Sequence, residues 1–172
     1  MVRNKLCIAI CDDDEEIADK TEKQVEKVLK ELGVINYEID VYFDGRELIK
    51  WEKVPDLLLL DIEMPGINGF QVTETFVALE KEPLVIFLTS YEKYVPEGYR
   101  YRPFDFVIKS KDGENLKKAI GRAVKKILTV KTVETVILKN RKGESKVIEV
   151  SRISYIKADA GDSYVYVKDE EY

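Results

Sequence analysis

Short apolar runs recur along the first three quarters of the chain and predict the strands of a sheet. The first run, Leu6–Cys11, is nearly continuous, without the alternation of apolar and polar residues that marks a half-exposed strand. Continuous runs of this length are typical of strands that are covered on both faces, as in parallel sheets. We predict four further strands, at Tyr37–Phe43, Leu57–Leu60, Leu84–Leu88 and Phe104–Ile108.

Stretches with helical spacing separate the predicted strands. Three acids at positions 12–14 precede an apolar stripe that Gly33 closes, and together they predict a long helix. We expect Pro96 and Gly98 to break up any helix between residues 91 and 103. The other predicted helices are a short one with Leu48, Ile49 and Trp51, a second at Gly69–Leu79, and a long one up to Leu128 that Asp112 caps.

This order of elements predicts two parts. Five strands that alternate with five helices predict a doubly wound α/β domain with a five-stranded parallel sheet over residues 1–128. Residues 129–172 instead contain short strands at close spacing, separated by the turn signals Arg141-Lys142-Gly143 and Ala160-Gly161-Asp162. This pattern predicts an all-β segment in which two hairpins supply about four strands.

Composition limits the classes of function. The chain has 172 residues, with 28 basic and 33 acidic side chains and a net charge of −5, so it is not a basic protein that coats nucleic acid. Its apolar runs are far shorter than the roughly 18–20 residues that span a bilayer. Histidine is absent, which excludes Ser-His-Asp and Cys-His catalysis, histidine zinc sites and a histidine phosphodonor.

The two cysteines, Cys7 and Cys11, both lie in the first predicted strand. Residues four apart on one strand are separated by ~13 Å, which is beyond the reach of a disulfide. The N-terminal apolar run ends in three acids and lacks a small-residue cleavage site, so we interpret it as a strand and not as a signal peptide. Two buried thiols in a chain without a leader indicate the reducing cytoplasm.

Polar side chains follow the ends of four predicted strands. Asp12 and Asp13 follow the first, Asp61 the third, Thr89 the fourth and Lys109 the fifth. In open parallel sheets, ligands bind at the carboxyl ends of the strands. Three carboxylates repel one another unless a divalent cation is present, and oxygen ligands with room for water suit Mg²⁺. A lysine and a hydroxyl then complete a pocket for a phosphoryl-sized anion beside a carboxylate nucleophile.

Each of these residues has an ordinary structural explanation when taken alone. Acids at positions 12–14 can cap a helix, and Asp61 before Met-Pro-Gly can form a turn. Thr89 alone is most often a strand-end residue, and Lys109 alone is most often solvated. The presence of all five residues at the correct ends of the correct strands favours a functional site.

The segments around these positions resemble the receiver domain of bacterial response regulators. The resemblance covers residues 5–128 and rests on CDDD at 11–14, LDIEMPG at 60–66, FLTS at 87–90 and DFVIK at 105–109. It implies a flavodoxin-like receiver fold and a phosphoacceptor, Asp61, that takes phosphate from a sensor histidine kinase. It also implies that Asp12, Asp13, Asp61 and the main-chain carbonyl of Glu63 hold Mg²⁺.

The resemblance assigns roles to three more positions. Thr89 and Lys109 would contact the phosphoryl oxygens, and Phe106 occupies the place of a switch aromatic whose rotamer follows Thr89. The sequence departs from the family at Ser110, where a proline in a cis peptide usually follows the lysine. A cis bond before a non-proline residue costs ~2.5–4 kcal/mol. We therefore expect a trans Lys109–Ser110 peptide and a slightly different placement of Lys109.

The segment after residue 130 resembles the start of a LytTR DNA-binding domain, through residues 148–150, 153–158 and 161–164. The resemblance implies a transcriptional output that binds DNA, with contacts near Gly161, Asp162 and Ser163. We interpret residues 129–172 as the incomplete N-terminal part of such a domain. This chain is accordingly expected to bind DNA weakly or not at all. A separate expectation is self-association as a homodimer on phosphorylation, through the face formed by the fourth helix, the fifth strand and the fifth helix of the receiver.

Four other functions are weighed as alternatives. A phosphorylation-dependent switch that binds proteins without binding DNA would share the same site, and a pseudo-receiver would lack some of its residues. A phosphatase of the haloacid dehalogenase type needs a second aspartate two residues after the nucleophile, where this chain has Glu63. A nucleotide or FMN binder needs a phosphate loop after the first strand, where three acids would repel a phosphate that lacks a metal.

Overall fold

The chain divides into two compact units, Met1–Ile127 and Leu128–Tyr172. The structure is a computed structural model. It describes residues 5–50, 53–80, 82–109, 113–131, 135–139, 142–149, 153–159 and 162–167. Ser110, Asp112, Trp51 and Gly161 lie outside these ranges, and so does the isomer of the Lys109–Ser110 peptide.

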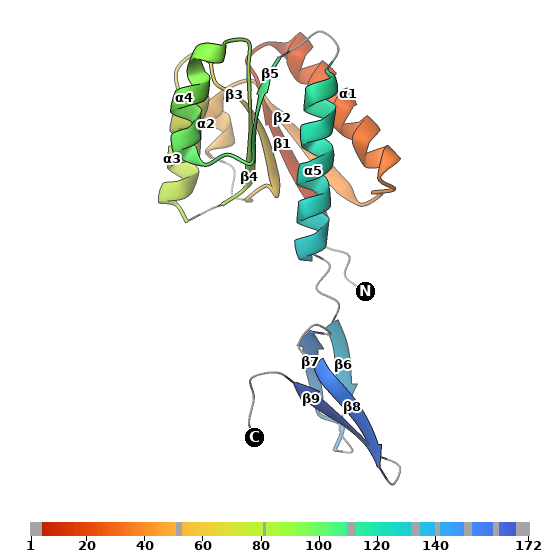
Figure 1. Cartoon of the computed structure of the whole chain (residues 1–172). Coiled ribbons are helices and arrows are strands. Elements are labelled where there is room, and N and C mark those ends of the chain that lie inside the picture. Colours follow the sequence, from red (N-terminus) through yellow and green to blue (C-terminus); the bar gives the residue numbers. More distant parts are fainter. Residues whose placement is uncertain are drawn as a thin grey trace. The chain divides into compact units, whose positions relative to one another are not determined.

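The first unit contains a parallel sheet in the strand order β2-β1-β3-β4-β5 (Figure 1). Every neighbouring pair is parallel, as the continuous apolar runs predict. The order reverses at β1, so the carboxyl ends of β1 and β3 flank the crevice where such sheets bind ligands. The strands are β1 (Leu6–Cys11), β2 (Tyr37–Tyr42), β3 (Leu57–Asp61), β4 (Leu84–Thr89) and β5 (Asp105–Ile108).

Helices cover both faces of this sheet. Figure 1 shows α1 and α5 on one side and α2, α3 and α4 on the other. Their bounds are α1 (Glu15–Glu31), α2 (Gly45–Leu48), α3 (Gly69–Ala78), α4 (Val95–Gly98) and α5 (Glu114–Lys131). The doubly wound α/β architecture predicted from the sequence is confirmed, although α2 ends at Leu48, before the predicted Ile49 and Trp51.

The apolar core follows from side-chain alternation along the strands. Leu58 and Leu60 of β3 pack with Phe70, Val72 and Phe76 in one buried cluster, on the face that α2 and α3 cover. Their neighbours in β3, Leu57 and Leu59, are also fully buried, and alternation places them on the opposite face, toward α1 and α5. Burial on both faces leaves the strand ends as the places where polar side chains can meet.

The segment between β4 and β5 is a succession of single helical turns. The 3₁₀-helix η1 (Glu92–Tyr94) leads into α4, and the 3₁₀-helix η2 (Tyr99–Tyr101) follows it. Pro96 lies in the first turn of α4, where its missing N–H would have had no partner within the helix. The expected break-up of this segment is confirmed, with Pro96 in the first turn of α4 and Gly98 at its end.

The second unit consists of two antiparallel hairpins, as predicted. One pairs β6 (Thr135–Lys139) with β7 (Ser145–Glu149), and the other pairs β8 (Ile153–Asp159) with β9 (Asp162–Val167). In the first hairpin, the cross-strand partners Ile137 and Val147 are both largely exposed. In the second, the rings of Tyr155 and Tyr166 stack 4.2 Å apart and remain partly exposed.

The two cysteines and the helices can be compared with two further expectations from the sequence. Cys11 is buried as expected, but Cys7 is only half-buried, and neither cysteine is in a disulfide. Among the described residues, no helix is both long enough and apolar enough to cross a membrane.

Candidate functional site

Asp12, Asp61 and Lys109 form a buried ion triad at the carboxyl ends of β1, β3 and β5. The Lys109 Nζ lies 2.7 Å from Asp12 Oδ2 and 2.8 Å from Asp61 Oδ1. The side chains of Asp12 and Asp61 are only 1% and 7% exposed, and that of Lys109 is 17% exposed. Two carboxylates and one ammonium leave an excess negative charge in a site that little water reaches.

Burial controls the protonation of this triad. It raises the pKa of Asp61 to about 6, although Lys109 opposes the shift. Burial also raises the pKa of Asp12, again against the effect of Lys109. For Lys109 burial acts in the other direction, but the two carboxylates outweigh it and leave its pKa raised. The carboxylates therefore carry a desolvation cost that one ammonium does not fully offset.

Asp13 completes a group that suits a divalent cation. One carboxylate oxygen from each of Asp12, Asp13 and Asp61 can be chosen so that all three lie within 4.8 Å of one another. Asp13 is exposed, so the cluster opens to solvent on one side and leaves room for water ligands. Hard oxygen donors together with water are what Mg²⁺ prefers. The arrangement therefore fits the Mg²⁺ ion expected from the sequence.

The third acid of the run has a different position. The Asp14 carboxylate caps α1, accepting hydrogen bonds from the Glu16 N–H at 2.9 Å and the Ile17 N–H at 3.1 Å. The backbone N–H of Asp14 donates to Asp12 Oδ1 at 3.2 Å. Helix capping, the ordinary explanation for acids at positions 12–14, is thus correct for Asp14, whereas Asp12 and Asp13 belong to the carboxylate cluster.

A close backbone approach holds Asp61 in place. A Cβ atom at Gly69 would lie 2.3 Å from the Asp61 carbonyl oxygen, so only glycine allows α3 to begin so near the end of β3. The Gly69 N–H donates to the Ile62 carbonyl at 3.1 Å, which fastens the same contact. The sequence indicated Gly69 only as a helix start, because nothing local reveals a contact with a residue eight positions earlier.

Thr89 and Lys109 are joined through their backbones. The Lys109 N–H donates to the Thr89 carbonyl at 2.7 Å, in continuation of the β4–β5 ladder. Thr89 is fully buried, and its hydroxyl oxygen accepts a hydrogen bond from the Tyr91 N–H at 3.1 Å. The two residues expected to contact a phosphoryl group therefore end adjacent strands that are fixed to each other.

Glu63 takes part in a contact that sequence reasoning missed. Its side chain accepts a hydrogen bond from the Tyr94 hydroxyl, and Lys93 Nζ lies 3.4 Å from the same oxygen. The Lys93 ammonium also lies over the rings of Tyr91 and Tyr94, at 4.8 and 4.7 Å from their centroids. This contact links the loop after Asp61 to η1. Tyr94 also lines a cavity of ≈ 430 Å³ with Asp13 and Glu63, at the mouth of the site.

Phe106 lies on β5 beside the central aromatic cluster. It is the register partner of Phe87, whose ring centroid is 6.1 Å from that of Phe106. Its ring also fills the space next to Gly98 of α4. Phe106 is partly buried, and it therefore connects the sheet to the helical segment that follows Thr89.

Of the positions expected in DNA contacts, Asp162 begins β9 and Ser163 pairs with Ala158.

Comparison with known proteins gives consistent matches to the first unit. The family model described as "Response regulator receiver domain" matches residues 8–121. The sensory transduction protein LytT of Bacillus anthracis is 27% identical over 110 residues, which are 64% of this chain and 44% of that protein. An uncharacterized response regulatory protein of Vibrio vulnificus is 30% identical over 122 residues, 68% of this chain and 47% of that protein.

A solved structure matches as well. The response regulator protein TrrA of Thermotoga maritima, in complex with Mg²⁺ and BeF, is 31% identical, with a TM-score of 0.53. The match covers 68% of this chain and 97% of that one. The chain thus spans nearly the whole of a solved receiver, but only about half the length of the curated relatives it matches.

Proposed function

Because the chain belongs to the response regulator receiver family, we propose that Asp61 accepts a phosphoryl group from a sensor histidine kinase. The observation that carries this proposal is the cluster of Asp12, Asp13 and Asp61 beside the Lys109 ammonium. The proposed nucleophile, Asp61, and the positively charged Lys109 ammonium both lie at the crevice of the sheet.

The transfer is a substitution at phosphorus. An Asp61 carboxylate oxygen forms the new P–O bond while the P–N bond to the donor's histidine breaks, and the imidazole keeps that electron pair. Asp12, Asp13, Asp61 and the Glu63 main-chain carbonyl would hold Mg²⁺, which would supply charge neutralisation for the reacting oxygens. Lys109 moves its ammonium from the carboxylates to a phosphoryl oxygen, and the Thr89 hydroxyl donates to another.

Signal transmission is proposed to run through Phe106. Movement of Thr89 toward the phosphoryl group changes the space beside β5, and the Phe106 ring shifts inward. Addition of beryllofluoride, a phosphoryl mimic, is expected to alter the face formed by α4, β5 and α5, and self-association as a homodimer would use this face. An unchanged NMR signal of Phe106 after beryllofluoride addition would reject this coupling.

Residues 129–172 are proposed to be part of a LytTR-type DNA-binding output. The name of the LytT relatives supports this, as do two hairpins that leave large apolar side chains exposed. Exposed cross-strand pairs such as Ile137 and Val147 require a further apolar surface to cover them. A protein-binding output that does not contact DNA is the alternative.

Labelling with acetyl phosphate tests the proposed phosphoacceptor. We expect labelling of the wild-type chain in Mg²⁺ and none in EDTA, because the carboxylates need a cation before one of them can approach an anion. Asp61→Asn should abolish labelling, and Asp13→Ala should abolish metal binding.

Asp14→Asn is the matched control, since it removes an adjacent acid while keeping a good N-cap at α1. This variant should label like wild type. Undiminished labelling of Asp61→Asn would reject the assignment.

A further inference from the structure

A second hollow lies at the opposite end of the sheet from the ion triad. It has a volume of ≈ 900 Å³, within the range of small-molecule sites. Its walls come from α3, the start of β4, η2, the segment before β5, and α5. Leu84 and Phe104 lie at the amino ends of β4 and β5, whereas Thr89 and Lys109 lie at the carboxyl ends. The hollow is therefore separate from the phosphoacceptor site.

The inner wall of this hollow is apolar. Phe76 and Val85 are buried, and Leu84 and Phe104 are half-buried. The Phe104 N–H donates to the Val85 carbonyl at 2.7 Å, so the two strand starts that form this wall are fastened together. Such a wall can bury the apolar part of a ligand without leaving backbone groups unpaired.

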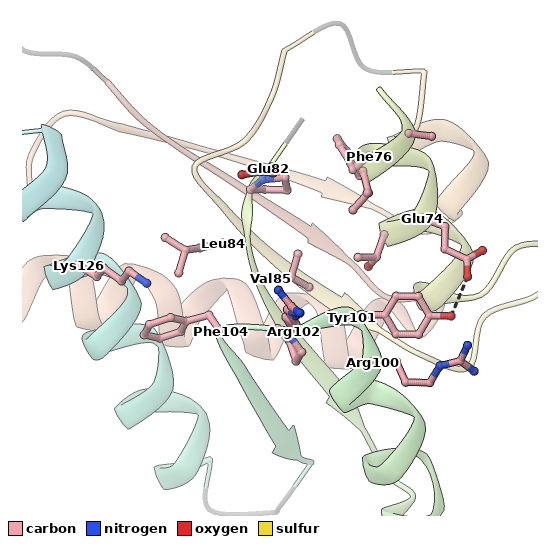
Figure 2. A pocket seen from close by; sticks show the side chains of 15 residues that line it. Glu74, Phe76, Glu82, Leu84, Val85, Arg100, Tyr101, Arg102, Phe104 and Lys126 are labelled. Carbon is pink, nitrogen blue, oxygen red and sulfur yellow. Dashed lines mark hydrogen bonds between the residues drawn. The ribbon is translucent and has the colours of Figure 1, made fainter. Parts of the chain in front are cut away.

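Three cations surround the apolar wall. Figure 2 shows Arg100, Arg102 and Lys126 around the hollow, with Lys126 toward Phe104. The Lys126 Nζ lies 5.4 Å from the Phe104 ring centroid, so this ammonium lies close to the apolar wall. Within the part of the chain that the structure describes, neither arginine is in an ion pair. The guanidinium groups are thus available to an anion.

The acids at the rim do not cancel this charge. Glu74 accepts a hydrogen bond from the Tyr101 hydroxyl, at 2.8 Å, and is held by that contact (Figure 2). Glu82 is the second acid. Among the lining residues that the structure describes, three basic groups stand against two acids, so this part of the rim is positive although the chain as a whole is negative.

The backbone at Arg102 is unusual. Its φ of +47° and ψ of +49° are left-handed, a conformation that costs free energy for a residue with a Cβ. Pro103 follows, and a proline disfavours the right-handed alternative for the residue before it. Strained positions of this kind cluster at ligand sites. Glycine is the usual residue in this conformation, but here the position is occupied by Arg102, whose side chain lines the hollow.

We propose that this hollow binds a small amphipathic anion, with an aliphatic or aromatic body and one carboxylate or phosphate group. The body lies against Leu84, Val85 and Phe104, and the anionic group pairs with Arg102 and Lys126. A guanidinium and an ammonium recognise the carboxylate and the phosphate through the same charge-assisted hydrogen bonds.

Three eight-carbon probes separate the contributions of charge and apolar contact. Octanoate, octanol and octyltrimethylammonium are titrated into the full 172-residue chain, with methyl NMR of Leu84 and Val85 as the readout. Octanoate should bind about fivefold or more tightly than octanol, and octyltrimethylammonium should bind most weakly. Octyl phosphate in place of octanoate shows which anionic group is preferred.

Substitutions of Arg102 and Lys126 test whether these two side chains bind the anionic group. Arg102→Gly relieves the backbone and should fold, but octanoate affinity should fall about fivefold or more, while Arg102→Lys retains most of it. Lys126→Gln is an independent second test, and Lys27→Gln, an exposed lysine of α1, is the control. Equal binding of the three probes, shifts confined to other methyl groups, or octanoate binding unchanged in both Arg102→Gly and Lys126→Gln would overturn the proposal.

Discussion

Gly98 and Phe106 share one space. A Cβ atom at Gly98 would lie 2.5 Å from Phe106 Cε2 and 2.9 Å from Cδ2. The backbone of Gly98 is helical, with φ −57°, so glycine is present for its lack of a side chain and not for its conformation. The α4 helix can pass this close to β5 only because position 98 has no side chain, since the Phe106 ring fills the volume that one would need.

Gly98→Ala should therefore displace the Phe106 ring. An alanine in a helix ordinarily stabilises by up to ~1 kcal/mol relative to glycine. Overpacking against the ring costs about 1–3 kcal/mol, so the net effect should be destabilising by roughly 1 kcal/mol. Urea denaturation measures the stability, and ¹⁹F NMR of 4-fluorophenylalanine-labelled protein measures the shift of Phe106.

Phe106→Leu serves both to assign the resonance and as the background for a double variant. Gly98→Ala should lose most of its penalty once the ring is absent. A stabilising Gly98→Ala in the presence of Phe106 would contradict the shared space.

The raised pKa of Asp61 predicts how stability depends on pH. The carboxyl has a pKa of about 6 in the folded chain, against about 3.9 when unfolded, so the folded chain binds more protons between these values. Stability without metal therefore falls as pH rises from about 4 to about 6, by up to ~3 kcal/mol for this group.

Urea denaturation in EDTA at pH 4.5 and 7, for wild type and Asp61→Asn, measures this effect. The wild-type chain should gain stability relative to Asp61→Asn at the lower pH. Mg²⁺ should offset the loss at pH 7, because it binds the ionised form. A difference between the two proteins that is independent of pH would argue against the shift.

Lys109 pairs with Asp12 and Asp61, two of the carboxylates proposed to bind Mg²⁺. Lys109→Gln should therefore bind Mg²⁺ more tightly than wild type, as measured by isothermal titration calorimetry. In EDTA the same variant should lose about 3 kcal/mol of stability, because two buried carboxylates lose their partner. Lys93→Gln is the control, since Lys93 is 63% exposed and pairs with Glu63 instead. Weaker Mg²⁺ binding by Lys109→Gln would show that the ammonium assists the cation.

The Glu63–Tyr94 hydrogen bond should couple the two loops energetically. A double-mutant cycle with Glu63→Gln and Tyr94→Phe is expected to give an interaction energy of about 1 kcal/mol by urea denaturation. The pair is exposed, so a larger value is not expected. Repeating the cycle with Thr75→Val and Glu63→Gln, which share no hydrogen bond, gives the baseline. An interaction energy no larger than this baseline would mean that the loops move independently.

DNA binding by this chain should be weak and unselective. In the described hairpins, Tyr155, Ile156 and Tyr164 are exposed. The basic side chains of the hairpins therefore lie among exposed apolar groups and do not form a continuous basic surface for a duplex. Affinity for DNA needs several phosphate contacts made together. Fluorescence anisotropy at physiological salt, on selected and scrambled duplexes, compares this chain with a version extended to a full output domain. Sub-micromolar, selective binding by the shorter chain would contradict this prediction.

Much of the site could be predicted because it depends on strand ends. A continuous apolar run such as Leu57–Leu60 can only be a buried strand or a buried helix segment, and its length favours the strand. Once the strands are parallel, the residues that follow them must meet at one edge. The contact of Lys109 with both Asp12 and Asp61 follows from this geometry. The distances between the Lys109 ammonium and the two carboxylates could not be predicted from it.

The contacts made by residues 91–104 could not be predicted. This stretch has no helical or strand period, and its short turns are stabilised by tertiary contacts such as Tyr94 with Glu63. The packing of Gly98 against Phe106 joins positions eight apart in sequence across two elements. The left-handed Arg102 gives no local signal either, since asparagine or glycine is the usual residue there.

The hydrogen bond between the Lys109 N–H and the Thr89 carbonyl also bears on how the domain tolerates sequence change. It fixes the lysine backbone at the end of β5, so the point from which the Lys109 side chain extends is set by the sheet. Thr89 and the Lys109 backbone are therefore held side by side by the ladder between β4 and β5. Engineering of the loop after residue 109 should alter the edge of the site while the Lys109 backbone stays where the sheet holds it.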